Sequence, residues 1–163
     1  MTVSETQPSG SRRYPTVPME KRFSELSARQ LHDILALRSG VFIVEQECVY
    51  NDIDGRDIEP TTRHLWIDHD GAPAAYLRQL HDRDGVIRVG RVVTDPGHRG
   101  QGLAARLVRH VTERQSGQVV LDAQAHLHNW YAQLGFVRDG DDFVEDGIAH
   151  IPMRLDSVSH AVE

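Results

Sequence analysis

The segment Arg99-Gly100-Gln101-Gly102-Leu103-Ala104 has the clearest chemical character in this chain of 163 residues. It follows a valine-rich stretch that ends near Thr94, and it opens a run of apolar residues at helical spacing. Glycines let the backbone approach a ligand closely, and the first N–H groups of a helix, together with the helix dipole, favour an anion. This order of strand, glycine-rich turn and helix predicts a phosphate-binding site that needs no metal.

Two common phosphate loops do not fit this segment. Gly100-Gln101-Gly102-Leu103 lacks the Gly-Lys-Ser/Thr ending with which a mononucleotide P-loop holds a metal-bound triphosphate. Gly97, Gly100 and Gly102 do not have the glycine spacing of the dinucleotide fingerprint. The sequence therefore favours a phosphorylated ligand of another kind.

Three other chemical patterns are weaker. The run Asp52–Asp57 resembles a calcium loop but lacks the third carboxylate before the glycine and the distal glutamate. His126 and His128 have no clear third metal ligand near them. Cys48 is the single cysteine, and no adjacent base marks it as a nucleophile. We expect no metal site and no cysteine chemistry.

Apolar periodicity and turn residues predict the elements in the first half of the chain. Ser27-Ala28-Arg29-Gln30 has the spacing of a capping box, so a helix is expected to begin there and to continue past Arg38 toward Gln46. His64–Asp68 and Ala74–Leu80 read as a hairpin about Asp70-Gly71.

The second half alternates strands with helices. Val86–Thr94 is expected to be a strand, followed by a helix from Leu103 to Gly117 and a strand over Val119–Ala123. A short helix over Asn129–Leu134 precedes Phe136-Val137 and Ile148–Leu155, which are expected as terminal strands around an Asp146-Gly147 turn. A meander followed by alternating elements predicts a mixed α/β sheet with helices packed on its faces.

Composition fits one globular domain, which we place at residues 19–156 between a flexible N-terminal tail, 1–18, and a C-terminal tail, 157–163. With 18 basic and 24 acidic side chains the net charge is -6, which disfavours nucleic acid as a partner. No apolar run is long enough to cross a membrane, and residues 1–18 lack the apolar core of a secretory signal. We expect a cytoplasmic protein. Several arginines near the glycine-rich turn could serve a polyanionic ligand or form a solvated helix face: Arg99, Arg106, Arg109 and Arg114.

The glycine-rich turn also resembles a known signature. Arg99, Gly102 and Ala104 match the Arg/Gln-x-x-Gly-x-Gly/Ala pattern of the GNAT acetyltransferases. Further segments over roughly residues 20–155 are similar to the ElaA-like branch of that superfamily: Val41–Gln46, Asp52–Gly55, Gly90–Val93, Gln124–His126 and Asp146–Met153.

The resemblance implies the GNAT fold, a mixed and mostly antiparallel sheet of about six to seven strands with helices on both faces. Two parallel strands splay apart in that fold, and here they would be Val86–Thr94 and Val119–Ala123. Acetyl-CoA would be the co-substrate, its thioester lying in the gap with the carbonyl oxygen near the Val93 N–H. The resemblance implies these cofactor-binding residues: Val92, Val93, Thr94, Arg99, Gly100, Gln101, Gly102, Leu103, Ala104, Asn129 and Tyr131.

Direct acetylation of an amine needs one proton to leave the ammonium and another to reach the thiolate. Asn129–Phe136 resembles the GNAT helix whose tyrosine protonates the coenzyme A sulfur, which assigns that role to Tyr131; the alternative is a tyrosine that merely packs under the cofactor. Glu45 and His64 are the candidate bases, Glu45 because its apolar surroundings could raise its pKa and His64 because imidazole titrates near neutrality.

Both candidate bases have a structural alternative. Glu45 could instead form a salt bridge with Arg38 or Arg78, and His64 could be a hydrogen-bonded structural histidine. For the acceptor site the candidates are two arginines for an acidic group, an aromatic wall and a histidine beyond the splayed strand: Arg78, Arg91, Tyr76 and His126.

These residues favour transfer of an acetyl group from acetyl-CoA to a primary amine of a small molecule or peptide, by direct attack in a ternary complex. Two alternatives remain open. One is an acyltransferase like the acyl-homoserine-lactone synthases, whose fold is related, and the other is a non-catalytic acyl-CoA sensor that regulates a partner. A homodimer through a sheet edge is also an expectation.

Overall fold

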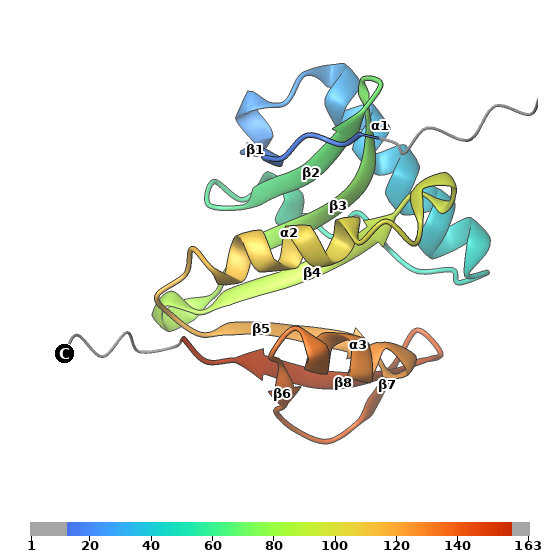
Figure 1. Cartoon of the computed structure of the whole chain (residues 1–163). Coiled ribbons are helices and arrows are strands. Elements are labelled where there is room, and N and C mark those ends of the chain that lie inside the picture. Colours follow the sequence, from blue (N-terminus) through green and yellow to red (C-terminus); the bar gives the residue numbers. More distant parts are fainter. Residues whose placement is uncertain (1–12, 158–163) are drawn as a thin grey trace, which may run out of the picture.

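The hairpin about Asp70-Gly71 forms the second and third strands of a mixed sheet in the computed structural model, which describes residues 13–157 (Figure 1). Residues 1–12 and 158–163, which include most of the two expected tails, lie outside the described part. Within it, an eight-stranded sheet has the order β1-β2-β3-β4-β5-β8-β6, and β7 pairs with β8. The strands are β1 Met19–Lys21, β2 Arg63–His69, β3 Ala72–His81, β4 Ile87–Thr94, β5 Val119–Gln124, β6 Val137–Arg138, β7 Phe143–Glu145 and β8 Ile148–Leu155.

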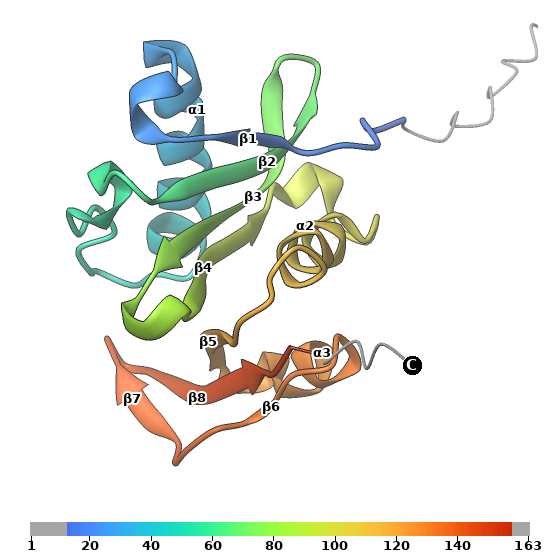
Figure 2. The same ribbon diagram turned by 90° about the vertical axis from the view of Figure 1, so that its left-hand side faces the viewer.

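The sheet confirms the GNAT fold that the resemblance implies, with one strand more than the six to seven expected. Every pairing is antiparallel except that of β4 with β5. That pair joins only at Ile87 with Val119 and at Arg88 with Val120, after which the strands diverge (Figures 1 and 2). The predicted splayed pair is therefore present, and it divides the sheet into a β1–β4 part and a β5–β8 part.

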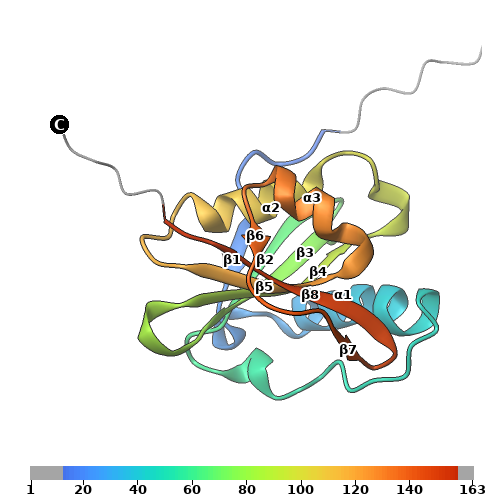
Figure 3. The same ribbon diagram turned by 90° about the horizontal axis from the view of Figure 1, so that it is seen from below.

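Helices cover both faces of the sheet. Helix α1, Ala28–Ser39, lies on one face, and α2, Leu103–Thr112, and α3, His128–Gln133, lie on the other (Figure 3). The capping box at the start of α1 is confirmed, because Gln30 N–H donates to Ser27 Oγ and Ser27 N–H donates to Gln30 Oε1, both at 3.0 Å. No helix within residues 13–157 is long and apolar enough to cross a membrane.

The predicted second helix is shorter than expected. Helix α2 ends at Thr112 rather than at Gly117. A Cβ atom at Gly117 would lie 2.9 Å from the carbonyl oxygen of Gly85, so this glycine permits two loops to approach each other instead of ending the helix.

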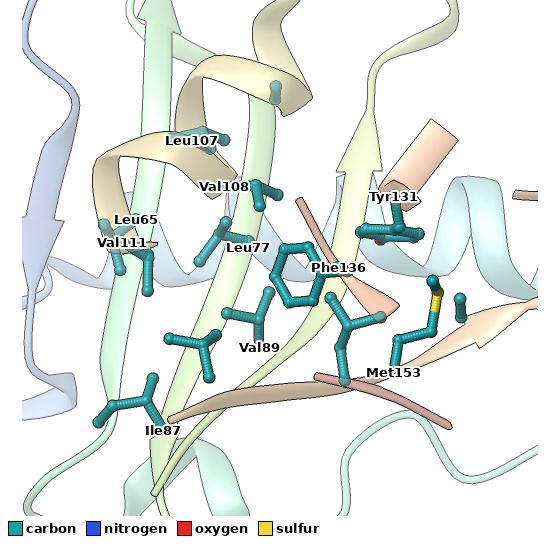
Figure 4. Packing of buried hydrophobic residues seen from close by; sticks show 14 of the residues in the cluster. Leu65, Leu77, Ile87, Val89, Leu107, Val108, Val111, Tyr131, Phe136 and Met153 are labelled. Atoms are coloured by element: carbon teal, nitrogen blue, oxygen red, sulfur yellow. The ribbon is translucent and has the colours of Figure 1, made fainter. Parts of the chain in front are cut away.

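Two hydrophobic clusters hold these layers together. The larger lies between the sheet and helices α2 and α3, where Leu77, Val108 and Phe136 are almost completely buried (Figure 4). The smaller lies under α1 and joins Ile34 to Tyr76 of β3. Helices thus pack against both faces of the sheet. The sheet is open between these faces where β4 and β5 diverge.

Candidate active site

A cavity of about 960 Å³ opens where β4 and β5 part. The turn before α2, strand β4 and the loop after α1 contribute to its wall, as do α3 and the β7–β8 turn. It brings together almost the whole set of cofactor-binding residues that the resemblance implied: Val92, Val93, Thr94, Arg99, Gly100, Gln101, Gly102, Leu103, Ala104 and Tyr131. Asn129 is the exception, since it does not line the cavity.

One end of the cavity is made from backbone. Gly100 and Gly102 have φ values of +78° and +71°, a region that side chains strain to reach. Gly102 is the N-cap of α2 and supplies no side chain to cap the helix. The first N–H groups of α2 therefore face the cavity with the positive end of the helix dipole, which fits the pyrophosphate of an acyl-CoA.

Strand β4 carries a bulge beside the gap. Arg78 of β3 pairs with Gly90, but Tyr76, two residues earlier in β3, pairs with Val93, so β4 has one residue more than its partner. Arg91 takes the left-handed conformation there, with φ 52°. The bulge leaves Arg91 and Val92 without a partner on β3. On its other side β4 has no partner within residues 13–157 beyond Arg88, where it has parted from β5, so strand N–H groups there can pair with a ligand in the cavity.

Tyr131 of α3 stands at the gap. Tyr131 is 6% exposed and lines the cavity, and its ring packs edge-on against Trp130, with centroids 4.8 Å apart. It also packs edge-on against Phe136, with centroids 5.9 Å apart (Figure 4). Burial raises the pKa of the Tyr131 phenol above its ordinary value, so the hydroxyl stays protonated at neutral pH. A protonated phenol at this position can donate to a leaving group.

The opposite end of the cavity rests on buried charges. Arg38 is fully buried and donates to Asp52 at 3.0 Å and to Asp57 at 2.7 Å. Arg78 donates to both carboxylate oxygens of Asp54 at 2.8 Å, and Arg91 lies 2.8 Å from Asp52. These chains come from α1, β3, β4 and the loop between α1 and β2, and they fix that loop as one wall of the cavity.

The chain is similar to known proteins over most of its length. The model of the acetyltransferase (GNAT) domain matches residues 36–157. The UPF0039 protein Rv2851c of Mycobacterium tuberculosis is 46% identical over 134 residues, which cover 79% of this chain and 86% of that protein. Protein ElaA of Escherichia coli is 39% identical over 142 residues, covering 83% and 93%.

The chain belongs to the GNAT acetyltransferase family.

Solved structures agree with this assignment. The chain matches an acyl-CoA N-acyltransferase from Pseudomonas aeruginosa with a TM-score of 0.79 and 37% identity, over 88% of this chain and 99% of that one. The E. coli ElaA structure gives a TM-score of 0.78 at 35% identity, over 88% and 100%. This GNAT protein therefore has the fold of the ElaA relatives and of the enzymes that transfer an acyl group from an acyl-CoA.

One of the two candidate bases, Glu45, lines the cavity, but its pKa is shifted in the direction opposite to the one expected. Glu45 lines the cavity and accepts two hydrogen bonds from Arg99, at 2.8 and 2.6 Å. These hydrogen bonds lower the pKa of Glu45, which corrects the expectation that apolar surroundings raise it. The salt bridge considered for Glu45 exists, with Arg99 in place of Arg38 or Arg78.

The second candidate base lies elsewhere. His64 is 1% exposed and does not line the cavity; its Nδ1 is 2.7 Å from the Tyr76 hydroxyl and its Nε2 is 3.0 Å from the Asp57 carbonyl oxygen. Desolvation lowers the pKa of His64. It is a hydrogen-bonded structural histidine, and we do not retain it as a base. Tyr76, the partner of His64, is fully buried and does not line the cavity, which corrects the expectation that it forms a wall of the acceptor cleft.

The remaining acceptor candidates line the cavity in different states. His126 is exposed there. Arg78 and Arg91 also line it, but their guanidinium groups already hold Asp54 and Asp52, which limits their freedom to bind an acidic acceptor.

Only one of the four arginines of the expected cluster lines the cavity, and part of the expected N-terminal tail packs against a helix. Arg99 lines the cavity, whereas Arg106 donates to the carbonyl oxygens of Pro15 and Thr16, and Arg109 and Arg114 are not in the wall. These contacts place residues 15 and 16, which we assigned to the N-terminal tail, against α2.

Several cavity residues were missed at the level of sequence. Asp122 and Gln124 at the end of β5 and His150 of β8 line the wall where β4 and β5 part. They alternate with the buried residues of two neighbouring strands, a pattern that could have placed them on one face. His150 also lies within the Asp146–Met153 motif, whose role the sequence left unassigned.

Proposed function

We propose that this protein transfers an acetyl group from acetyl-CoA to a primary amine of a small molecule or peptide, by direct attack in a ternary complex. The observation that carries the proposal is the joint placement of an uncapped, glycine-rich helix start and a protonated Tyr131 on one cavity. The first suits the pyrophosphate of coenzyme A, and the second suits its departing sulfur. The single cysteine, Cys48, suits a reducing compartment, so we place the reaction in the cytoplasm.

Several main-chain N–H groups and the side chain of Tyr131 each have a defined task in this reaction. The N–H groups from Arg99 to Ala104 hold the pyrophosphate, and the edge of β4 that has parted from β5, at Val92 and Val93, pairs with the pantetheine arm. A strand N–H near Val93 stabilises the oxyanion that develops when the amine attacks the thioester carbon. As the C–N bond forms and the C–S bond breaks, Tyr131 gives its phenolic proton to the thiolate.

The test is thiol release from acetyl-CoA with a panel of polyamines, aminoglycosides and lysine peptides. We expect turnover by the native protein and a loss in kcat on the order of 10²-fold or more for Tyr131→Phe. Calorimetry with coenzyme A should give the same Kd for both proteins. Absence of turnover across the panel with intact coenzyme A binding would contradict the proposal.

Two other functions make different predictions in the same experiment. The fold is also similar to that of the acyl-homoserine-lactone synthase LasI, with a TM-score of 0.66 at 16% identity, which shows the fold alone. A synthase of that type would form its product only with S-adenosylmethionine as acceptor, which mass spectrometry detects. A non-catalytic sensor would bind acyl-CoA and be indifferent to Tyr131→Phe.

A further inference from the structure

The cavity contains an imidazole that the steps above do not use. His150 of β8 is half-buried in the wall and pairs with Gln124, the last residue of β5. Gln124 lines the same wall, beyond the point where β5 has parted from β4. His150 therefore stands beside the gap through which the thioester must be reached.

The ring of His150 is held in one orientation and one tautomer. Its Nδ1 lies 2.8 Å from the carbonyl oxygen of Ile148, and because a carbonyl only accepts, the proton of the neutral ring is on Nδ1. Phe143 stacks on the ring with centroids 5.5 Å apart and an interplanar angle of 17°. Nε2 is left as a bare acceptor, and no residue between 13 and 157 hydrogen-bonds to it.

His150 and Tyr131 lie on opposite faces of the sheet. Ile151 and Met153, which alternate with His150 along β8, point into the cluster that contains Tyr131. His150 consequently points to the other face. A base and an acid can therefore reach the gap from its two sides, His150 toward the acceptor amine and Tyr131 toward the departing sulfur.

The other basic groups of the cavity are less suited to this step. Glu45 is held by Arg99, Asp54 by Arg78, and Asp122 lies 3.2 Å from Arg88. His126 is exposed and has no hydrogen bond to a residue within 13–157.

We propose, on the basis of the function above, that His150 is the general base for the acceptor. Nε2 takes one proton from the ammonium group, and the neutral amine attacks the thioester carbon. The C–N bond forms and the C–S bond breaks, and the nitrogen loses its second proton to solvent. The thiolate receives the proton of Tyr131, which regains one from solvent, while His150 releases its extra proton to solvent. The sum is amide, coenzyme A and one released proton.

Several charged and titratable groups face this site and contribute to its pH dependence. They are Glu145 at the end of β7, Asp146 on the turn to β8, Asp122 on β5 with its partner Arg88 on β4, Cys48 in contact with the Asp146 carbonyl, and His126 before α3. A pH profile must therefore be compared between variants and not interpreted from the native protein alone.

The experiment compares His150→Asn with the native protein. The asparagine amide can replace the Nδ1–H donor to Ile148 but has no group at the position of Nε2. We expect kcat for a strongly basic acceptor such as spermidine to fall on the order of 10²-fold at pH 7 and to recover as the pH approaches the pKa of the amine. An aryl amine or hydrazide, already neutral at pH 7, should lose far less. Coenzyme A affinity should not change.

The outcomes separate this inference from the function on which it rests. His81→Asn, at the exposed end of β3 outside the cavity, is the matched control and should behave as the native protein. Native turnover with an unchanged rate in His150→Asn, or with an equal loss for basic and neutral acceptors at every pH, would overturn the role of His150. Absence of turnover by the native protein would overturn the proposed function and this inference with it.

Discussion

The two ends of the cavity are built from different chemical groups, main-chain N–H groups at one end and ion-paired side chains at the other. At the acyl-CoA end, Gly100 and Gly102 shape a backbone turn, and the donors are main-chain N–H groups. At the acceptor end, the wall is a loop fixed by buried ion pairs of Arg38 and Arg78 with carboxylates. A backbone site needs glycines at fixed positions, whereas a side-chain site needs partners from distant segments. The first therefore depends on one continuous segment of the chain, and the second on several segments at once.

The ion pairs at the acceptor end should matter most for stability. Arg38 is fully buried and holds Asp52 and Asp57. Arg38→Ala would therefore remove one of the two arginine partners from each of these buried carboxylates, which keep Arg91 and Arg78, respectively. We expect the free energy of unfolding to fall by about 3–5 kcal/mol. Urea denaturation followed by circular dichroism measures it.

The control for this prediction is an exposed pair on the same helix. Arg29, with a side chain 84% exposed, contacts Asp33, and Arg29→Ala should change stability by less than about 0.5 kcal/mol. Equal effects of the two substitutions would mean that the buried cluster does not hold the acceptor wall.

At the acyl-CoA end, the affinity for coenzyme A should depend on the backbone conformation and not on a side-chain charge. Gly102→Val places a β-branched residue at φ +71° in the anion-binding turn. We expect the Kd for coenzyme A to rise by at least about tenfold, measured by calorimetry. Gly40→Ala is the control, since Gly40 is helical with φ −60° and has open space around it. An unchanged Kd in Gly102→Val would show that this turn does not bind the pyrophosphate.

The acceptor end should also make stability depend on pH. The pKa of His64 is lowered by burial, so the unfolded chain binds a proton that the folded chain does not. This part of the stability is present above the unfolded pKa of about 6.5 and is lost as the pH falls below it, by at most about 1.4 kcal/mol per pH unit. His64→Gln should flatten the change in urea midpoint between pH 7 and pH 5. An unaltered slope would assign it to other groups, such as His110, whose pKa is also lowered.

The smallest effect is expected where the two ends meet. Glu45, at the end of the π-helical turn Gly40–Glu45 that follows α1, binds Arg99 of the glycine-rich turn, and both side chains are well exposed. Glu45→Gln releases Arg99 for the anionic co-substrate, so coenzyme A affinity should rise by about two- to fivefold while kcat changes little. Isothermal titration and steady-state kinetics test this. A large loss of kcat at unchanged affinity would restore Glu45 as the base.

The local elements of the chain were largely predictable. Ser27 and Gln30 form the capping box that their spacing indicates, and the turn at Asp70-Gly71 joins the expected hairpin. Prediction was wrong where a tertiary contact decided: α2 stops at Thr112, and Gly117 serves a close approach to Gly85. The short strand β7, Phe143–Glu145, had no expected range because three residues are too few to show alternation.

The sequence by itself determined the acyl-CoA end, because glycines and a helix start act through the backbone of one continuous segment, Arg99–Ala104. Only the tertiary structure decided the acceptor end. His64 was selected for its chemistry, but in the fold it is buried against Tyr76. The fold also brings Arg99 to Glu45, which lowers the pKa of Glu45. The same folding brings His150 to the gap that β4 and β5 leave. The partners and the exposure of a side chain depend on segments far away in the chain, so they cannot be inferred from the spacing of residues within one segment.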